Sequence, residues 1–577
     1  MAKMKGRRMF MTETHQSVRT DALYMNPDRG IATLDFSKYY VNNFYNLINS
    51  KGLVEIIRLY LTSSHHTKDA NGIENVSAEE YVAILKKVFI NDDHAYDDFT
   101  PQEILASFES LYSFYRSFLR VSITNFNDNS VITHSFKEAD ARFNDLVIRN
   151  YRIIEEKLQG FVNNVYRQVN AGTNATLLVR DHQWPAPKGY ESLTDVTFID
   201  KVMLQPPMLM HTKSNKREGV FSAVDYNPVD HFAGQRQEWL CYPAKVGESL
   251  IFIYFHVDYM VNGLALSNLF ELATAEEVEG QKPDAILIFG QEKTAGDVSH
   301  YHYDSDNNLW VGEVPYNDKT TYFGYMKKMC LTLHNLHQIY SGKLPIHGSM
   351  VRIKFTNGKD KTVVFFGDSG AGKSESLEAL QEIADEQIVE METIFDDMGS
   401  FILDDQAKGG IYAQGTETGA FVRLDDLSSS VAFSNMDRGV FLNPERKNAR
   451  VIIPADAYEN VVAHHEIDMW VYANNYSDGI GVHQFENEEE AKEVFIAGKR
   501  KALGTTDEVG MSSTFFANPF GPVQEPERTK PIIDEVFKRL FKDGVYVGEV
   551  YTHLGTDKSK DALHESAQEL LDQLMNS

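Results

Sequence analysis

The first third of the chain, from about residue 35 to residue 172, has apolar side chains at the three- and four-residue spacing of amphipathic helices. Thr100-Pro101-Gln102-Glu103 has the composition of a helix start, with an N-cap threonine, a first-turn proline and a capping-box glutamate. Ser77-Ala78-Glu79-Glu80 opens a second helix in the same way. A longer amphipathic segment starts near Phe136 and is expected to end at Asn170-Ala171-Gly172, where glycine can take the C-cap. The pattern predicts a helical N-terminal extension over residues 1–172, serving as a lid or in oligomerisation.

Beyond Gly172 the pattern changes to short apolar runs that are typical of buried strands. Polar or helical segments separate these runs, and the pair Pro206-Pro207 and the stretch Lys213 to Glu218 are typical of loops. We therefore expect an α/β fold, with an α/β domain over residues 173–340 and a second domain over residues 341–577. The predicted strands of the first domain are 175–179, 249–255 and 285–289.

The pattern of the stretch Val363 to Glu375 predicts a buried strand, a glycine-rich turn and the start of a helix. The turn and helix start fit the phosphate-loop pattern, in which backbone N–H groups turn inward around a phosphate and the helix dipole favours the same anion. Lys373 adds a positive charge and the Ser374 hydroxyl can bind a divalent metal; we expect Lys373 to be exposed when no ligand is bound. The predicted polyphosphate site consists of Gly367, Asp368, Ser369, Gly370, Ala371, Gly372, Lys373 and Ser374.

Further candidate side chains flank this loop in the sequence. The segment Tyr322-Phe323-Gly324-Tyr325-Met326-Lys327-Lys328 precedes a predicted helix, and His347 lies about 20 residues before the loop. After the loop, Thr393-Ile394-Phe395-Asp396-Asp397 is an apolar run that ends in adjacent carboxylates, a form that delivers an acid to the metal of a nucleotide site. Their order around a phosphate loop favours a shared site.

Composition limits the classes of function. The 577 residues are 42% hydrophobic, and the formal net charge of −27 argues against binding to nucleic acid or to an anionic membrane. Cys241 and Cys330 are too few for a disulfide framework or a cysteine metal site. The most apolar stretch, 250–266, is interrupted by polar residues, and no apolar segment follows the basic start. We predict a soluble cytoplasmic protein with small-molecule partners.

From about Trp239 to the C-terminus, the sequence resembles nucleotide-dependent phosphoenolpyruvate carboxykinase. The resemblance covers about 300 residues and leaves the helical first part unexplained. It implies a two-domain phosphate-loop fold of that family with an additional N-terminal region. The segments that carry it are 269–270, 275–277, 282–290, Tyr322-x-Gly324-x-Met326-Lys327-Lys328, His347, Gly367 to Ser374, Asp396-Asp397, Asn448-Ala449-Arg450-Val451, Gly498, Lys501, Gly504-Thr505, Phe520-Gly521 and the elements from Ile532 to the end.

The resemblance also implies roles for individual residues. Lys328, His347 and Asp397 would bind a catalytic Mn²⁺, and Ser374 with an acid of the Asp396-Asp397 pair would hold the Mg²⁺ of the nucleotide. Lys373 would contact the transferred phosphoryl group, Tyr322 and Arg450 would face the organic substrate, and Ser369 would lie near it. The implied reaction converts oxaloacetate into phosphoenolpyruvate and CO₂ with phosphoryl transfer from ATP, and GTP or pyrophosphate stays open as donor. A mobile lid is expected to begin in Val471 to His483.

The sequence also departs from the family. The arginine for the substrate carboxylate is not evident, with Arg217 and Arg236 as candidates, and residues 506–510 lack the arginine expected near the base. His347-Gly348-Ser349-Met350-Val351 and the phosphate loop look more like HPr kinase. In that alternative, His347 and Asp397 would handle the proton of an acceptor hydroxyl, and the acceptor would be a protein or a small molecule. A non-catalytic nucleotide-binding regulator is the third interpretation.

Overall fold

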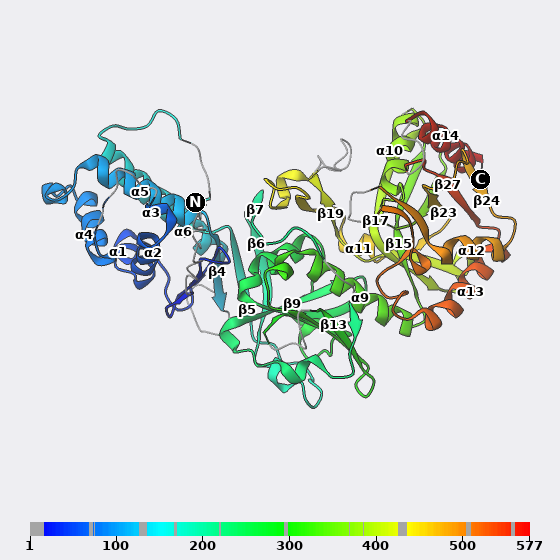
Figure 1. Cartoon of the computed structure of the whole chain (residues 1–577), viewed down its shortest axis with the longest axis horizontal. Coiled ribbons are helices and arrows are strands. Elements are labelled where there is room, and N and C mark those ends of the chain that lie inside the picture. Colours follow the sequence, from blue (N-terminus) through cyan, green and yellow to red (C-terminus); the bar gives the residue numbers. More distant parts are fainter. Residues whose placement is uncertain are drawn as a thin grey trace, which may run out of the picture. The chain divides into compact units, whose positions relative to one another are not determined.

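The computed structural model describes most of the chain (Figure 1). The chain divides into two compact units. Unit 1 is Met1–Arg180 with Ile199–Gln205, and unit 2 is Asp181–Phe198 with Pro206–Ser577. The domain boundaries expected from the sequence, at 172 and 340, stay a prediction. The described residues are 17–67, 73, 75–125, 136–166, 170–217, 221–292, 298–368, 370–384, 386–424, 435–503, 509–554 and 560–576.

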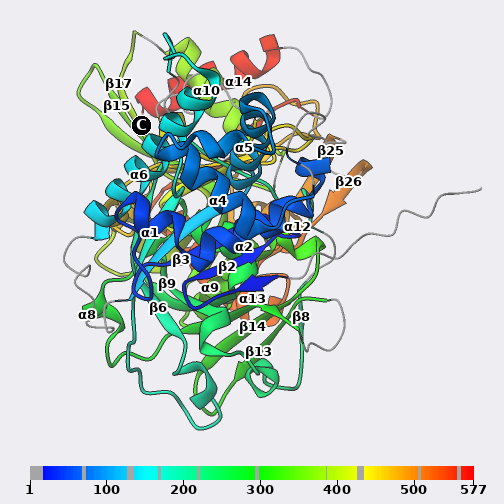
Figure 2. The ribbon, with the colours of Figure 1, turned by 90° about the vertical axis from the view of Figure 1, so that its left-hand side faces the viewer.

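Unit 1 combines helices with a layer of strands. Strands β1, β2 and β3 form an antiparallel meander, and β3, β4 and β5 pair in parallel. Figure 2, which views the molecule from this side, shows helices α2 and α4 beside β2 and β3, and their side chains share one apolar core. The elements are β1 (Val18–Arg19), β2 (Leu23–Asn26), β3 (Ile31–Asp35), α1 (Phe44–Ile48), α2 (Lys51–Leu61), α3 (Ser64–Thr67), α4 (Ala78–Phe89), α5 (Pro101–Arg116), β4 (Leu119–Asn125), α6 (Phe136–Gln159), β5 (Ala175–Arg180) and β6 (Thr197–Leu204).

The two predicted helix starts of unit 1 are confirmed. Thr100 and Ser77 accept hydrogen bonds from the N–H groups of Glu103 and Glu80, and both glutamates bond back to the cap N–H, which completes two capping boxes. The prediction of a wholly helical region is wrong, because β1–β4 lie within it. Helix α6 also ends earlier than predicted, at Gln159, where Gly160 follows with φ +83°. Glycine takes this left-handed conformation at low cost, so Gly160 ends the helix 10 residues before Asn170.

The first sheet of unit 2 confirms the strands predicted at 249–255 and 285–289. Its strands follow the spatial order β9-β10-β12-β14-β13-β8, with parallel pairing of β10, β12 and β14, and helix α9 packs on these three strands. Strands β10, β12 and β14 are buried on both faces, which explains their continuous apolar sequences. The strands of this sheet are β8 (Ser222–Ala223), β9 (Trp239–Val246), β10 (Ser249–His256), β12 (Ala285–Gln291), β13 (His300–Asp304) and β14 (Leu309–Pro315), and the helix is α9 (Gly324–Tyr340).

The second sheet of unit 2 has the order β22-β18-β17-β15-β16-β23-β27-β24 and carries helices on both faces. Val363 and Phe365 of β16 pack with α10 and α14, whereas Val364 and Phe366 pack with α12 and α13. This period-two alternation makes three layers. The elements are β15 (Leu344–Phe355), β16 (Asp360–Phe366), α10 (Lys373–Ile383), β17 (Ile388–Leu403), β18 (Ile411–Gly415), β22 (His465–Glu466), β23 (Met469–Asn474), β24 (Val482–Gln484), α12 (Glu488–Ala497), α13 (Pro526–Lys542), β27 (Tyr546–Tyr551) and α14 (Lys560–Asn576).

Two smaller sheets complete unit 2. One has the order β19-β21-β20-β7 and the other is the ribbon β25-β26. The α/β class predicted from the sequence is confirmed. The prediction of a mobile lid is wrong for the first four residues of the segment, because Val471–Asn474 belong to the buried strand β23. Among the described residues, none of the helices has the length and apolar character needed to cross a bilayer. The strands are β7 (Met208–Met210), β19 (Gly419–Arg423), β20 (Val440–Leu442), β21 (Arg450–Pro454), β25 (Lys499–Leu503) and β26 (Val509–Ser513).

Candidate active site

Asp397 of β17 is the centre of a group of ionised side chains. Its Oδ2 accepts hydrogen bonds from the ammonium groups of Lys327 and Lys328, both at 2.8 Å, and its Oδ1 lies 3.1 Å from Nε2 of His347. Lys327 also lies 2.9 Å from Oε1 of Glu417. The structure therefore brings together Lys328, His347 and Asp397, although 69 residues separate the first from the last. We call Lys327, Lys328, His347, Asp397 and Glu417 the Asp397 cluster.

The members of the cluster come from two strands, one helix and a loop. Strands β15 and β17 are antiparallel, with Gly348 opposite Asp397, so His347 and Asp397 come from adjacent strands. Asp397 has φ +80°, a left-handed conformation that aspartate tolerates better than most residues. Lys327 and Lys328 lie in the first turn of α9, and Lys327 is only 2% exposed. The arrangement therefore depends on strand pairing and on the docking of α9.

The His347 ring has a defined tautomer. Its Nδ1 lies 2.7 Å from the carbonyl oxygen of Ala517, to which it donates. A neutral ring with its proton on Nδ1 presents the Nε2 lone pair to Asp397. A lone pair that faces a carboxylate oxygen at 3.1 Å is favourable only when a proton or a cation lies between the two atoms. The pair is therefore suited to hold a proton or a metal ion.

The cluster shifts the pKa values of its members in different directions. Burial favours the neutral carboxyl of Asp397, but the charges of Lys327 and Lys328 with His347 hold its pKa well below the usual range. Burial and the neighbouring Lys327 ammonium lower the pKa of Lys328, although Asp397 opposes them. Burial raises the pKa of Glu417 to about 7. Lys328 is thus the amine of the cluster that is most easily deprotonated.

The phosphate loop lies between β16 and α10, as predicted. Gly370 and Gly372 have φ of +80° and +104°, and a Cβ on Gly372 would lie 2.5 Å from Cβ of Thr552, so both positions favour glycine. Asn475 donates to the Gly370 carbonyl at 3.0 Å and Thr552 donates to the Ala371 carbonyl at 2.7 Å. These side chains fix the conformation of the loop from the ends of β23 and β27.

Lys373 and Ser374 occupy the first turn of α10. The prediction that Lys373 is exposed is wrong: it is 8% exposed, and its ammonium donates to the carbonyl oxygens of Gly367 at 2.9 Å and Asp368 at 3.3 Å. The ammonium thus satisfies its donors inside the loop where a phosphate would be bound. Ser374 is exposed. Ser369 lies outside the described residues.

Asp396 and Asp368 extend the site toward the phosphate loop. Burial and the adjacent Asp397 raise the pKa of Asp396, whereas Lys373 and Lys327 lower it, so Asp396 lies within the field of the loop lysine. Asp368 accepts a hydrogen bond from Nε of Arg500 on β25 at 3.0 Å. Sequence reasoning missed Arg500, for which the basic run Lys499-Arg500-Lys501 was the available signal.

Tyr322 and Arg450 meet at the ring of Phe421 on β19. The Arg450 guanidinium lies 5.4 Å and the Lys327 ammonium 5.6 Å from the ring centroid, and the Tyr322 ring lies 6.1 Å away. Because Lys327 also contacts Asp397, Phe421 connects the predicted substrate side chains with the Asp397 cluster. Sequence reasoning missed Phe421, and no local signal marks it.

The structure distinguishes the two arginines considered for the substrate carboxylate. The Arg217 guanidinium lies 6.0 Å from the centroid of the Phe520 ring, and Lys328 lies 4.6 Å from the same centroid. Burial lowers the pKa of Arg217, while Tyr325 and Tyr322 raise it, which places these phenols nearby. Arg236 instead forms an ion pair with Asp181 and is half exposed. Arg217 is therefore the better candidate.

The donor set of the cluster fits a transition metal only with lysine as one ligand. Within the described ranges, no three His, Cys, Asp or Glu side chains converge as a metal site. His347 Nε2 and the Asp397 carboxylate supply two donors, and deprotonated Lys328 supplies a third. No protein-family model matches the chain. The geometry of the site, with the resemblance in sequence, therefore carries the functional argument.

Proposed function

We propose that the protein is a phosphoenolpyruvate carboxykinase-like enzyme, which decarboxylates oxaloacetate and transfers a phosphoryl group from a nucleoside triphosphate to give phosphoenolpyruvate and CO₂. The observation that carries the proposal is the convergence of Lys328 and His347 on Asp397, with the His347 tautomer fixed by Ala517. An amine, an imidazole and a carboxylate form the set that the resemblance assigns to Mn²⁺. The Tyr322, Arg450 and Arg217 side chains around the cluster support the same assignment.

In this proposal the Asp397 cluster acts in the decarboxylation half of the reaction. Asp397, His347 and deprotonated Lys328 would hold Mn²⁺, and Ser374 with Asp396 would hold Mg²⁺. Bound there, the two ions would supply charge stabilisation for the developing enolate and for the transferred phosphoryl group. Arg217 would bind the substrate carboxylate, and Tyr322 and Arg450 would orient the dicarboxylate. The rings of Phe421 and Phe520 would exclude water, which would otherwise protonate the enolate to pyruvate.

The phosphate loop would act in the transfer half. The Lys373 ammonium would exchange the Gly367 and Asp368 carbonyls for phosphate oxygens, and the N–H groups at the start of α10 would add favourable dipoles. In-line transfer depends on positioning and charge neutralisation. ATP is the proposed donor, with GTP and pyrophosphate as alternatives.

The test is oxaloacetate-dependent release of CO₂ with Mn²⁺ and each of ATP, GTP and pyrophosphate, with phosphoenolpyruvate measured as the second product. We expect turnover with one of the three donors. Lys328→Ala should abolish the dependence on Mn²⁺, whereas Lys343→Ala, which removes a surface lysine paired with Glu248, should leave it unchanged. An unchanged Mn²⁺ titration in Lys328→Ala would refute the metal assignment.

A second candidate is a kinase on the same scaffold, resembling HPr kinase. The observation that favours it is the 3.1 Å contact between His347 Nε2 and Asp397 Oδ1, since such a pair can take the proton of an acceptor hydroxyl. An enzyme that transfers phosphate to a hydroxyl and ignores oxaloacetate would support this candidate. Nucleotide binding with no turnover on either acceptor would instead support a regulator.

A further inference from the structure

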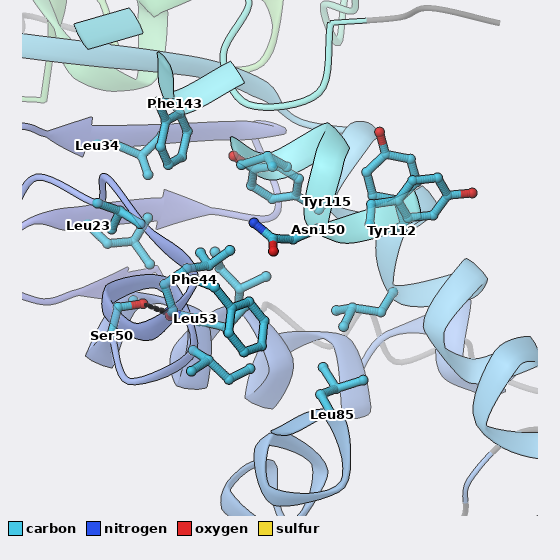
Figure 3. Close-up of a pocket in the computed structure, with 18 of the residues that line it drawn as sticks. Leu23, Leu34, Phe44, Ser50, Leu53, Leu85, Tyr112, Tyr115, Phe143 and Asn150 are labelled. Atoms are coloured by element: carbon cyan, nitrogen blue, oxygen red, sulfur yellow. Dashed lines mark hydrogen bonds between the residues drawn. The ribbon is translucent and has the colours of Figure 1, made fainter. Parts of the chain in front are cut away.

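Unit 1 contains a pocket that plays no part in the proposed chemistry. The pocket has a volume of about 160 Å³, and the described residues that line it belong to unit 1, from β2, β3, α1, α2, α4, α5, α6 and the segments beside them (Figure 3). Apolar cavities of about 150 Å³ hold one benzene-sized molecule. The pocket is therefore large enough for a single small ring.

The wall of this unit 1 pocket is mainly aliphatic and aromatic. Phe44, Leu53 and Leu85 line it from the helices, and Leu23 and Leu34 from the strands. The polar groups of Ser50, Tyr115 and Tyr151 on the wall are engaged elsewhere, because their hydroxyls donate to the Leu47 carbonyl, the Gly172 carbonyl and Glu109. The wall therefore favours an apolar ligand.

The hydroxyl of Tyr112 on this wall is buried with no hydrogen bond among the described residues. The other exception is Asn150. Its side chain is 6% exposed, and Nδ2 donates to the carbonyl of Leu146 at 2.7 Å, which leaves Oδ1 without a hydrogen bond among the described residues. Figure 3 shows its carboxamide in the middle of the side chains that line the pocket, whereas the Tyr112 hydroxyl points away. Because Oδ1 faces an apolar pocket and has no donor among the described residues, the site favours a ligand that donates one hydrogen bond to it.

The wall of the pocket reaches the protein surface at Tyr39. This residue lines the pocket and is 43% exposed, and its hydroxyl donates to the carbonyl of Asn46 at 3.1 Å. We therefore expect a small molecule to enter beside Tyr39 without unfolding of the core.

We propose that the unit 1 pocket binds a small neutral aromatic molecule with one O–H or N–H donor, of the size of phenol, and that this donor bonds to Oδ1 of Asn150. The aromatic rings on the wall, among them Phe44, Phe108 and Phe143, offer edge and face contacts to such a ring. A charged ligand is disfavoured, because no ionised side chain of the described residues lines the pocket. The site is independent of the Asp397 cluster.

The probes are 4-fluorophenol and fluorobenzene, titrated into the full-length protein and followed by ¹⁹F NMR. We expect saturable binding of both, with 4-fluorophenol bound more tightly. Asn150→Leu keeps the bulk of the side chain and removes the acceptor. It should therefore lower the affinity for 4-fluorophenol by about tenfold and leave the affinity for fluorobenzene unchanged. If this variant loses affinity equally for both probes, or binds 4-fluorophenol with unchanged affinity, Asn150 does not have the proposed role.

A second variant tests the location of the site. Gly52 of α2 lines the pocket, and a Cβ there would make only ordinary contacts of 3.7 Å with Leu23. Gly52→Leu should therefore fill the space without disrupting the fold and abolish binding of both probes, with an unfolding midpoint at or above that of the wild type. Gly52→Ala, which adds one methyl group, is the matched control and should still bind. The proposal would be overturned if the probes bind Gly52→Leu with the affinity of the wild type, or if they bind none of the proteins.

Discussion

The Asp397 cluster and the unit 1 pocket are both buried, but they are built in opposite ways. In the cluster, each charged group is held by another charge: Asp397 by two lysines and His347, and Lys327 by two carboxylates. In the pocket, apolar side chains surround one carboxamide, and no charge is involved. A buried charge whose partner is removed costs several kcal/mol, whereas an apolar wall responds mainly to volume. Substitutions should therefore act cooperatively in the cluster and locally in unit 1.

The largest effect is expected for Asp397→Asn. The amide has the shape of the carboxylate but leaves Lys327 and Lys328 without their shared counter-charge, so we expect a loss of about 3–5 kcal/mol in the free energy of unfolding. Loss of the central ligand should also reduce turnover by at least about 10³-fold. Chemical denaturation and the oxaloacetate assay measure the two effects.

The control for this variant is Asp360→Asn. Asp360 pairs with Arg352 on the surface, where both side chains are about two-fifths exposed, and such pairs contribute about 0–1 kcal/mol. If Asp397→Asn is no less stable than Asp360→Asn, the cluster does not depend on its central charge.

Lys373→Met should have the next largest effect, mainly on catalysis. Among the described residues, the ammonium donates hydrogen bonds only to carbonyl oxygens of its own loop, so its loss should change the free energy of unfolding by about 1 kcal/mol. Removal of a charge from the transferred phosphoryl group should lower kcat by about 10²–10³-fold. Steady-state kinetics with the preferred donor measures kcat and KM. The control is Lys354→Met, which breaks an exposed ion pair with Glu390. Equal kcat values in the two variants would show that Lys373 does not act in the transfer.

The difference between the regions also explains what the sequence could predict. The phosphate loop and the capping boxes at Thr100 and Ser77 are contiguous in sequence, so backbone geometry and hydrogen bonds within a few residues determine them. The buried strands β10 and β12 were predictable because both faces are covered, which leaves a continuous apolar run.

The order of the segments favoured a shared site, but the particular residues that meet at Asp397 were expected only from the resemblance. Asp397 reaches His347 through the pairing of β15 with β17, whose register shifts after Met350. The Ala517 carbonyl that orients His347 lies 170 residues away. Neither contact leaves a local pattern, and the same is true of Phe421. The short strands β1–β3 were missed because two to five residues are too few to show a period.

The pH dependence of Mn²⁺ binding should show a smaller effect. Lys328 must lose its proton to become a ligand, so the apparent affinity for Mn²⁺ should rise with pH, by up to about tenfold per unit, until the pH reaches the pKa of Lys328. Burial and Lys327 lower that pKa from its ordinary value, which brings the rise closer to neutral pH. Titrations of Mn²⁺ followed by electron paramagnetic resonance between pH 6 and about 9 measure the slope.

Lys328→Met should bind Mn²⁺ more weakly and with a smaller slope, because one proton fewer is released. Lys343→Met should keep the wild-type slope. A slope that is the same in Lys328→Met and the wild type would show that the released proton comes from another group.

The smallest effect is expected for the capping boxes of unit 1. Thr100→Ala removes the side-chain acceptor of the Glu103 N–H and should lower the free energy of unfolding of unit 1 by about 1 kcal/mol, and Ser77→Ala should do the same for α4. The caps lie on different helices and do not bond to each other, so the double variant should lose the sum of the two values. Ser113→Ala on the exposed face of α5 is the control and should be neutral or slightly stabilising, because alanine is the better helix former. Thermal unfolding measures these differences, and Mn²⁺ affinity measured on the same proteins should not change. A capping variant that alters Mn²⁺ binding would show that the two regions are energetically coupled, which their opposite construction does not predict.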